Sequence, residues 1–391
     1  MATGSERAVG TTASGLDILW DRQAEWRERL TMIAQAQRFV YVSLFYLEFD
    51  DHGRTFLEAL TTAARRGVRV QLIIDGFGQR LGGVLMSKRT RAALDAAFNQ
   101  LRLAGGDVRV YRPPHQVQRW MGAGHHYKIQ ISDAGAGLLA SGNVTTSSFD
   151  GWNECAVMCR GAIVPVLLER VATIGGEVAA ADLDVLRSLP AGPGAIPVEF
   201  WFCNPNDVQG PGGLLTWDGR NDVTDRMVEM VEAATRSLAI TSFYFKPTPG
   251  LLAAVVAAAK RGVRVEVFHS HRDALPATDL AWIAAAACYP ELLAAGVVIY
   301  ERLAGEHSKI VLVDDTWVAL GSYNFEDAAH DRLAEAMLAT RDAAVVESVA
   351  AIIARLRSAP GWSRVTSEVV DAWPSRVRRR VRWLGRFKRW L

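Results

Sequence analysis

The chain contains one polar motif twice, with the same internal spacing. Residues 307–324 read HSKIVLVDDTWVALGSYN, which is the pattern H-x-K-x4-D-x6-G-S-x-N. Residues 126–143 have the same polar residues at the same spacing, and only the glycine before the serine is replaced, by Ala140. Alanine fits there if the backbone φ is negative, so this change does not mark a dead site. Apolar runs predict two short buried strands in each copy. A motif duplicated in full predicts a chain built of two related halves.

The polar residues of both copies suit chemistry at a phosphate ester. A histidine can attack phosphorus or pass a proton to a leaving oxygen, so His126 and His307 are candidate catalytic residues. A glutamate follows each copy at the same interval, and its carboxylate can orient an imidazole. The further candidates are Lys128 and Lys309 as catalytic residues, Ser141, Asn143, Ser322 and Asn324 as phosphate ligands, and Glu154 and Glu335 as histidine-orienting residues.

The motif aspartates allow two interpretations. Asp133 and Asp314 belong to the repeated pattern, which groups them with the catalytic residues. Each also stands at the far end of the expected strand from its histidine, which favours a role in fixing the strand end. The two serines are similarly open, because a hydroxyl at that turn can donate to phosphate or shape the turn.

The rest of the sequence repeats in the same order around the motifs. Residues 63–70 (AARRGVRV) match residues 258–265 (AAKRGVRV), and each lies between an expected helix and an expected strand. Alternating helices and strands predict an α/β fold with a mostly parallel or mixed sheet covered by helices in each half. We expect a disordered lead over 1–14, halves at 15–187 and 214–360, and a Pro- and Gly-rich linker over 188–213 in which 198–202 can form a strand. The active site should lie on the seam, since each half supplies one histidine.

The charge distribution is uneven. The formal net charge is +2, of which residues 374–391 contribute +8, so the rest of the chain carries −6. An acidic body argues against a wide nucleic-acid channel, and no nucleic acid is expected as a partner. Four cysteines in 391 residues suggest free thiols in a reducing compartment. The first residues lack the apolar core of a signal peptide, and no run is long and apolar enough to span a membrane.

The last segment, residues 361–391, is expected to be a basic amphipathic tail. On a helix, Val377, Val381, Trp383, Leu384 and Phe387 share about half the circumference, with several arginines opposite. Arginines and tryptophans in this arrangement indicate an interfacial helix on an anionic membrane. A helix packed on the body or on nucleic acid is the alternative. Residues 118–122 and 77–86 are candidate second membrane contacts.

The paired motifs resemble those of the phospholipase D superfamily, and the segments around them resemble the short type of bacterial cardiolipin synthase. The resemblance extends from about Leu16 to Leu338. It implies a phosphatidyltransferase that passes a phosphatidyl group from one phosphatidylglycerol to another and releases glycerol. It also implies a phosphohistidine on His126, with His307 as acid and base, no metal or cofactor, and a peripheral enzyme on the cytoplasmic side of the cell membrane. A phospholipase D acting with water or another alcohol, a nuclease of the superfamily and a non-catalytic membrane adaptor are the alternatives.

Overall fold

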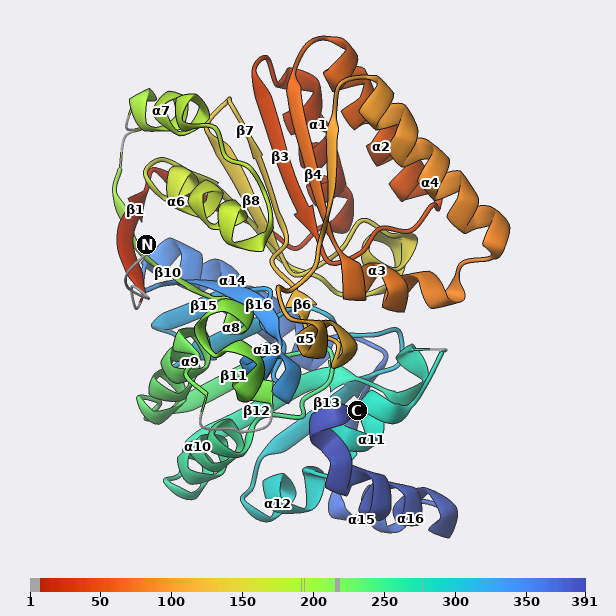
Figure 1. The fold of residues 1–391 in the computed structure, drawn as a ribbon. Coiled ribbons are helices and arrows are strands. Elements are labelled where there is room, and N and C mark those ends of the chain that lie inside the picture. Colours follow the sequence, from red (N-terminus) through yellow and green to blue (C-terminus); the bar gives the residue numbers. More distant parts are fainter. Residues whose placement is uncertain (1–7, 191, 193, 215–218, 276) are drawn as a thin grey trace.

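The computed structural model describes residues 8–190, 192, 194–214, 219–275 and 277–391, which form two sheets with helices between and outside them (Figure 1). The seven residues that precede residue 8, part of the expected lead, lie outside this range. The layers run from outer helices through the first sheet, a middle layer of helices and the second sheet to further outer helices. The expected α/β fold with two pseudo-symmetric halves is confirmed.

The first-half sheet is mixed rather than mostly parallel. Its three strands at one side are parallel, and the motif strands and their neighbours are antiparallel. In spatial order the strands are β2 (Gly15–Leu19), β9 (Ala156–Arg160), β8 (Ala136–Ala140), β7 (Ile129–Ser132), β3 (Phe39–Leu44), β4 (Arg69–Asp75) and β5 (Asp107–Tyr111).

The second-half sheet repeats this order and adds a strand at each edge. Its core order is β10 (Ile196–Cys203), β16 (Leu333–Thr340), β15 (Trp317–Gly321), β14 (Ile310–Val313), β11 (Ser237–Thr241), β12 (Arg264–Ser270) and β13 (Val298–Arg302). The edge strands are β1 (Val9–Ala13) beside β10 and β17 (Trp362–Val365) beside β13. The short β6 (Gly124–His125) pairs with β16 and joins the two halves.

Helices cover both faces of each sheet. The outer face of the first sheet packs on α1 (Arg22–Gln35), α2 (Asp51–Arg65) and α4 (Lys88–Leu103). The outer face of the second packs on α9 (Asp222–Glu232), α10 (Pro249–Lys260), α11 (Leu280–Ala286) and α12 (Tyr289–Ala294). Between the sheets lie α6 (Ile163–Glu169), α7 (Ala180–Ser188) and α14 (Ala343–Ser358), in one apolar core that both halves share. The shorter helices are α3 (Gly76–Gly82), α5 (Gln116–Trp120), α8 (Pro205–Val208), α13 (Asp327–Asp331), α15 (Ser367–Asp371) and α16 (Ser375–Leu384).

The repeated segment around Gly67 and Gly262 shows how the sequence produces this architecture. Side chains of Asp50 and Thr248 cap the starts of α2 and α10 by accepting backbone N–H bonds. Both helices end before a glycine with positive φ, 86° at Gly67 and 93° at Gly262, a conformation that glycine adopts without strain. The chain then enters β4 and β12, whose residues beyond the first arginine are all buried. Each half thus gains a helix packed on a central parallel strand.

Three expected boundaries are wrong. Residues 9–13 are not a disordered lead, because they form a strand that pairs with residues 196–200 of β10. The expected linker contains all of β10, which belongs to the second sheet and occupies the position that β2 has in the first. Residues 362–365 of the expected tail form β17. Edge backbone groups gain hydrogen bonds by pairing, and that gain orders segments whose composition suggests loops. Within the described residues, no helix has the length and apolar character required to cross a membrane.

Candidate active site

The two motif histidines lie on the seam, just before the first motif strand of each half. His126 precedes β7 and His307 precedes β14, and both side chains are buried. The backbone N–H of His126 donates to Ala334 O at 2.8 Å, and that of His307 donates to Asn153 O at 2.8 Å. Each histidine is therefore attached by its backbone to the opposite half, directly beside the glutamate of that half.

The glutamates cross the seam in the same way. Glu335 Oε1 lies 3.0 Å from His126 Nδ1, and Glu154 Oε1 lies 2.8 Å from His307 Nδ1. Each half therefore supplies the carboxylate that orients the histidine of the other half. Gly142 makes room for this arrangement, since a Cβ there would lie 2.9 Å from the Glu154 carboxylate.

The two motif serines support the glutamates. Ser141 Oγ donates to Glu154 Oε2 at 2.6 Å, and Ser322 Oγ donates to Glu335 Oε2 at 2.5 Å. Each hydroxyl also accepts a backbone N–H, from Cys155 and Ala336 respectively. Both hydroxyls are buried and already donate their hydrogen to a glutamate, which favours the turn-shaping interpretation of these serines over phosphate binding.

The two imidazoles have different neighbours at Nδ1. His126 Nδ1 faces two acceptors, the Glu335 carboxylate and Ser322 O at 2.9 Å. Burial raises the pKa of Glu335 well above its ordinary value, but the Ser322 carbonyl can only accept, so Nδ1 carries the hydrogen and the lone pair of this ring is on Nε2. His307 Nδ1 faces Glu154 and also Lys309 Nζ, a donor, at 2.9 Å. The geometry fixes the tautomer of His126 and leaves His307 able to exchange a proton with its surroundings.

Burial and the neighbouring lysines favour neutral imidazoles. Burial lowers the pKa of His126 well below its ordinary value, and Lys128 and Lys309 add to that effect. Burial also lowers the pKa of His307 to about 4, against the opposing charge of Glu154. Burial works against ionisation of Glu154, but His307 and Lys309 outweigh it and hold its pKa at about 2. A neutral histidine is the form that can act as a nucleophile or a base.

The motif lysines lie beside the histidines, and the asparagines follow the paired strands β8 and β15 at the same end of each sheet. Lys128 Nζ donates to His126 O at 3.0 Å, and Lys309 Nζ donates to His307 O at 2.5 Å. Burial lowers the pKa of Lys309 to about 8, against the opposing charges of Glu154 and Glu335. Asn143 Oδ1 accepts the Tyr46 N–H at 3.3 Å. Two ammonium groups and two amides thus lie in one site, which can hold the oxygens of an anionic phosphate.

The motif aspartates are not part of this site. Asp314 accepts backbone N–H bonds from Thr235, Arg236 and Ser237, at the end of β14 opposite His307. Asp133 accepts those of Gln37 and Phe39 at the equivalent place in the first half. The structure contradicts a catalytic role for both and supports the alternative interpretation that they fix the strand ends.

Sequence reasoning missed the aromatic residues around the histidines. The Phe45 ring lies edge-on to His126 at 4.8 Å between centroids, and Phe243 lies edge-on to His307 at 4.7 Å. These two occupy matching places in residues 43–46 (SLFY) and 241–244 (TSFY), so aligning the two halves could have revealed them. Trp152, which stacks on His307 at 5.0 Å, has no such signal.

Two buried polar residues next to the histidines were also missed. Asp75 accepts the backbone N–H of His125 at 2.9 Å, and Glu306 accepts that of Ser308 at 2.9 Å. Burial raises the pKa of both carboxyls to about 7. Both hold the backbone beside a histidine.

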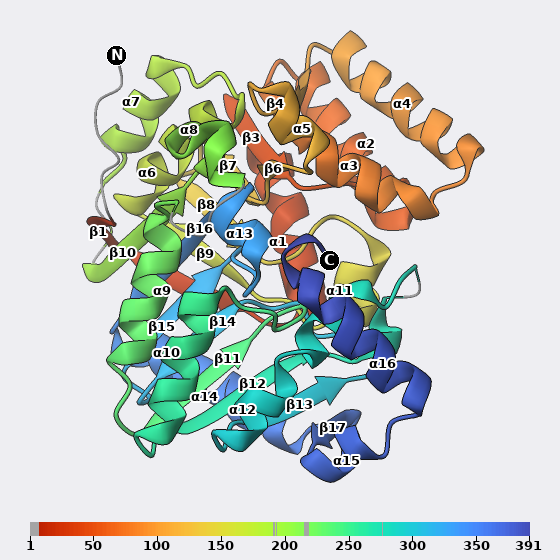
Figure 2. The ribbon, with the colours of Figure 1, turned by 60° about the horizontal axis from the view of Figure 1, so that its bottom comes forward.

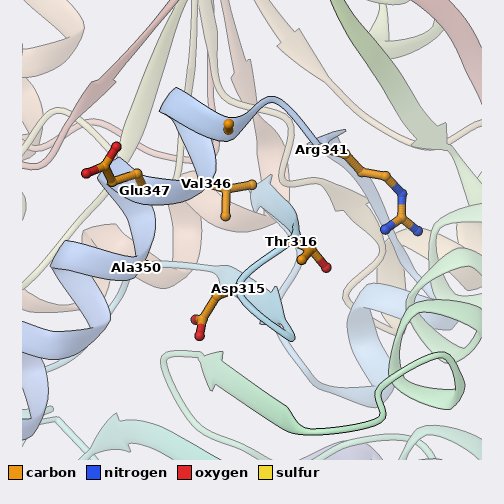
Figure 3. Close-up of a pocket in the computed structure, with 7 residues that line it drawn as sticks. Asp315, Thr316, Arg341, Val346, Glu347 and Ala350 are labelled. Atoms are coloured by element: carbon orange, nitrogen blue, oxygen red, sulfur yellow. The ribbon is translucent and has the colours of Figure 1, made fainter.

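A hollow of about 490 Å³ is lined by Arg341 and by residues of the β14–β15 turn and α14, among them Asp315 and Glu347 (Figure 3). It lies at the Asp314 end of β14, away from His307. Ala140, the one departure from the motif, is buried in β8. It is not among the residues with positive φ, so alanine is accommodated there.

A duplicated fold with crossed histidine–glutamate pairs defines a protein of the phospholipase D type. The sequence matches the family model described as "Cardiolipin synthase, PLD-like domain" over residues 30–171 and 227–357, and the chain belongs to that family. It is an enzyme of the phosphatidyltransferase or phospholipase D type.

Individual relatives agree with this family. The chain is 23% identical to a cardiolipin synthase of Clostridium perfringens over 83% of its own length and 67% of the relative's. It is 26% identical to cardiolipin synthase B of Salmonella typhi over 79% of its length and 72% of the relative's. The fold is similar to that of phosphatidylserine synthase of Haemophilus influenzae, with a TM-score of 0.71 and 14% identity, covering 97% of this chain and 95% of that one.

Proposed function

We propose that this enzyme makes cardiolipin by transferring the phosphatidyl group of one phosphatidylglycerol to the hydroxyl of another, with release of glycerol. The observation that carries the proposal is the pair of crossed histidine–glutamate contacts, which gives one site two oriented imidazoles. Two-step transfer needs one histidine to hold the group and one to move protons. Similarity to cardiolipin synthases supports the choice of lipid.

In the first step, His126 Nε2 attacks phosphorus, because its Nδ1 hydrogen is held by Glu335 and Ser322 O. The bond from phosphorus to the glycerol oxygen breaks, and His307, which enters this step as an imidazolium paired with the Glu154 carboxylate, gives that oxygen its Nε2 proton, so glycerol leaves. In the second step, His307 removes a proton from the hydroxyl of the second phosphatidylglycerol. That oxygen attacks phosphorus, the phosphorus–nitrogen bond breaks, and both histidines return to their first state. Lys128, Lys309, Asn143 and Asn324 hold the phosphate oxygens.

We also infer that the enzyme binds an anionic membrane surface through its tail, but by only part of the apolar face expected. Val377, Val381 and Leu384 pack on the second-half core, so the apolar side of α16 is used within the protein. The exposed side carries Trp383 and Phe387, 59% and 51% exposed. Exposed arginines surround them, at positions 378, 379, 382 and 386. Aromatic rings among arginines suit the headgroup layer of an anionic membrane.

The buried, unpaired state of all four cysteines suits a reducing compartment. We therefore propose that the enzyme works on the cytoplasmic side of the cell membrane.

Product analysis tests the function. Purified protein is incubated with phosphatidylglycerol vesicles, and the lipids and glycerol are resolved by mass spectrometry. We expect cardiolipin and glycerol in equal amounts from the wild type. We expect neither from His126→Ala or His307→Ala, whereas His115→Ala, an exposed histidine away from the site, should leave turnover unchanged. Phosphatidic acid as the main product would mean that water is the acceptor. The absence of any lipid product would exclude the proposal.

A further inference from the structure

The two phosphate-binding asparagines are held in different ways. Asn143 Oδ1 accepts the Tyr46 N–H, and its side chain also bonds the Tyr46 hydroxyl, a neutral partner. Asn324 Nδ2 instead donates to Glu326 Oε1 at 3.1 Å, and its Oδ1 is buried without a hydrogen-bond partner within the described residues. One of the two amide hydrogens that could reach phosphate is therefore engaged by a carboxylate of the protein itself.

Glu326 is in turn fixed by residues without counterparts in the first half. Lys246 Nζ lies 3.0 Å from Glu326 Oε2 and donates to the carbonyl oxygen of Leu391 at the end of the tail. Matching residues 43–48 (SLFYLE) with 241–246 (TSFYFK) puts Glu48 where Lys246 stands, and Thr145 corresponds to Glu326. The relay from Asn324 through Glu326 and Lys246 to the tail thus belongs to the second half-site alone.

The tail also forms ion pairs with the segment that links Asn324 to Glu335. Arg389, in the short 3-10 helix Gly385–Trp390 (η6) that follows α16, pairs with Asp331 at 2.9 Å, and both side chains are buried. Lys388 pairs with Asp327 at 3.2 Å. Asp327 and Asp331 are the first and last residues of α13, which stands between the phosphate-binding asparagine and the glutamate that orients His126. Figure 2 shows α16 running along α11 to bring the C-terminal end toward α13.

The same tail presents its aromatic and basic face to solvent. Trp383 and Phe387 lie on that face, one turn before the residues that grip α13. Insertion of this face into a lipid surface would weaken the contacts that Lys388 and Arg389 make with α13. A membrane can act on the site only if its binding changes these contacts, because a ligand shifts a conformational equilibrium only when it interacts differently with the two conformations.

We propose that Lys246 and Glu326 are positioning residues for Asn324, and that the docked tail holds them so that Asn324 is kept from the substrate phosphate until the tail engages an anionic membrane. The role of the membrane rests on the proposed function. The coupling of tail to phosphate binding does not.

The test measures binding of inorganic phosphate, so it does not depend on lipid turnover. Calorimetry gives the Kd for the wild type, for Lys388→Ala/Arg389→Ala, which undocks the tail, and for Glu326→Ala, which frees the Asn324 amide. Arg160→Ala, which removes an exposed ion pair with Asp17 on the first half, is the matched control. We expect about tenfold tighter phosphate binding in both relay variants, because one donor to a charged oxygen is regained, and no change in the control.

Two readouts separate a positioning role from a general loss of structure. Thermal melting must show that the variants are folded, and Asn324→Ala added to either relay variant must abolish the gain. With phosphatidylcholine vesicles that contain oleate, wild-type phosphate binding should tighten toward that of the variants, whose binding should not respond. Unchanged or weaker phosphate binding in a folded Lys388→Ala/Arg389→Ala protein would overturn the coupling. Tighter binding without any lipid turnover would keep the coupling and exclude only the proposed function.

Discussion

At the scale of single residues, the site depends on which glutamate meets which histidine. The sequence was enough to select His126, His307, Glu154 and Glu335, because the motifs and their intervals repeat. It was not enough to pair them, since the crossing results from β6 and the Asn153 loop joining the opposite half. The spacing of residues within each motif carries no information about a contact between two residues that are 209 positions apart in sequence, such as His126 and Glu335.

Replacing the crossed glutamates should affect different steps. We expect Glu335→Gln to lower the rate of the first transfer about 10³- to 10⁴-fold, because the carboxylate that fixes the His126 tautomer is lost. Glu154→Gln should slow the natural substrate but not a phosphatidyl ester of p-nitrophenol, which needs no proton donor. Stopped-flow measurement of nitrophenolate release distinguishes the two glutamate variants, and Glu169→Gln serves as a surface control. Equal loss on the activated ester in both glutamate variants would contradict the assignment.

The motif aspartate Asp314 should matter for stability rather than for turnover. Burial works against its ionisation, but the N–H of Ser237 and the hydroxyl of Thr235 outweigh it and lower its pKa to about 2 from 3.8. A carboxyl with a depressed pKa stabilises the fold fully above the unfolded pKa, and this contribution is lost as pH falls through the folded pKa.

We therefore expect Asp314→Asn to cost roughly 1–3 kcal/mol of unfolding free energy, measured by urea unfolding. The difference from wild type should be constant between pH 7 and about pH 5 and shrink below about pH 4. Turnover at low temperature should stay within a few-fold of wild type. A folded Asp314→Asn protein without activity would restore the aspartate to the catalytic set.

At the scale of elements, the tail shows where pattern reasoning stops. The amphipathic pattern of residues 374–391 predicted one helix with one apolar side. Ser375–Leu384 form that helix, α16, and the chain continues as the 3-10 helix η6. The pattern did not predict that α11 would offer that side an apolar surface within the same molecule. Burial of Val377, Val381 and Leu384 against the protein removes their apolar area from water. The periodicity of the sequence shows an apolar side, but it does not show whether a membrane or another part of the protein covers that side.

Membrane binding should follow the exposed side of the tail. We expect Trp383→Ser/Phe387→Ser to weaken binding to anionic vesicles about 10- to 100-fold, because two aromatic rings no longer enter the headgroup layer. Leu103→Ser, which changes an apolar residue on α4 that is still more exposed, should have no effect. Vesicle co-sedimentation measures both, and binding should weaken as salt rises. A larger effect of Leu103→Ser than of the tail variant would place the membrane contact on α4.

At the scale of the whole molecule, duplication explains most of what the sequence predicted. Two copies of one motif imply two halves, a seam and one shared site, and the order of strands is the same in both sheets. The edges of the halves were mispredicted because β1, β10 and β17 belong to a sheet only through pairing with their neighbours. The strand expected at 198–202 is present in β10, but the sequence did not show that it belongs to the second sheet. The shared core between the sheets makes the seam a packed interior rather than a contact of separate domains.

This construction predicts that two defective chains cannot repair each other. We expect mixtures of His126→Ala and His307→Ala proteins to stay below about 1% of wild-type turnover, because both histidines and both glutamates of a site come from one chain. A coupled assay of glycerol release measures it. Recovery of activity on mixing, in proportion to the product of the two concentrations, would mean that sites form between chains.

The identity of the nucleophile can be measured directly. His307→Ala is incubated with the phosphatidyl ester of p-nitrophenol, whose leaving group needs no proton, and the protein is quenched in base and digested for mass spectrometry. Since the second step lacks its base, we expect one phosphatidyl group per chain to accumulate on the peptide that contains His126. The corresponding experiment with His126→Ala should give no adduct. A phosphatidyl group on His307 in the His126→Ala protein, with none on His126 in the His307→Ala protein, would mean that His307 is the nucleophile and His126 the acid and base.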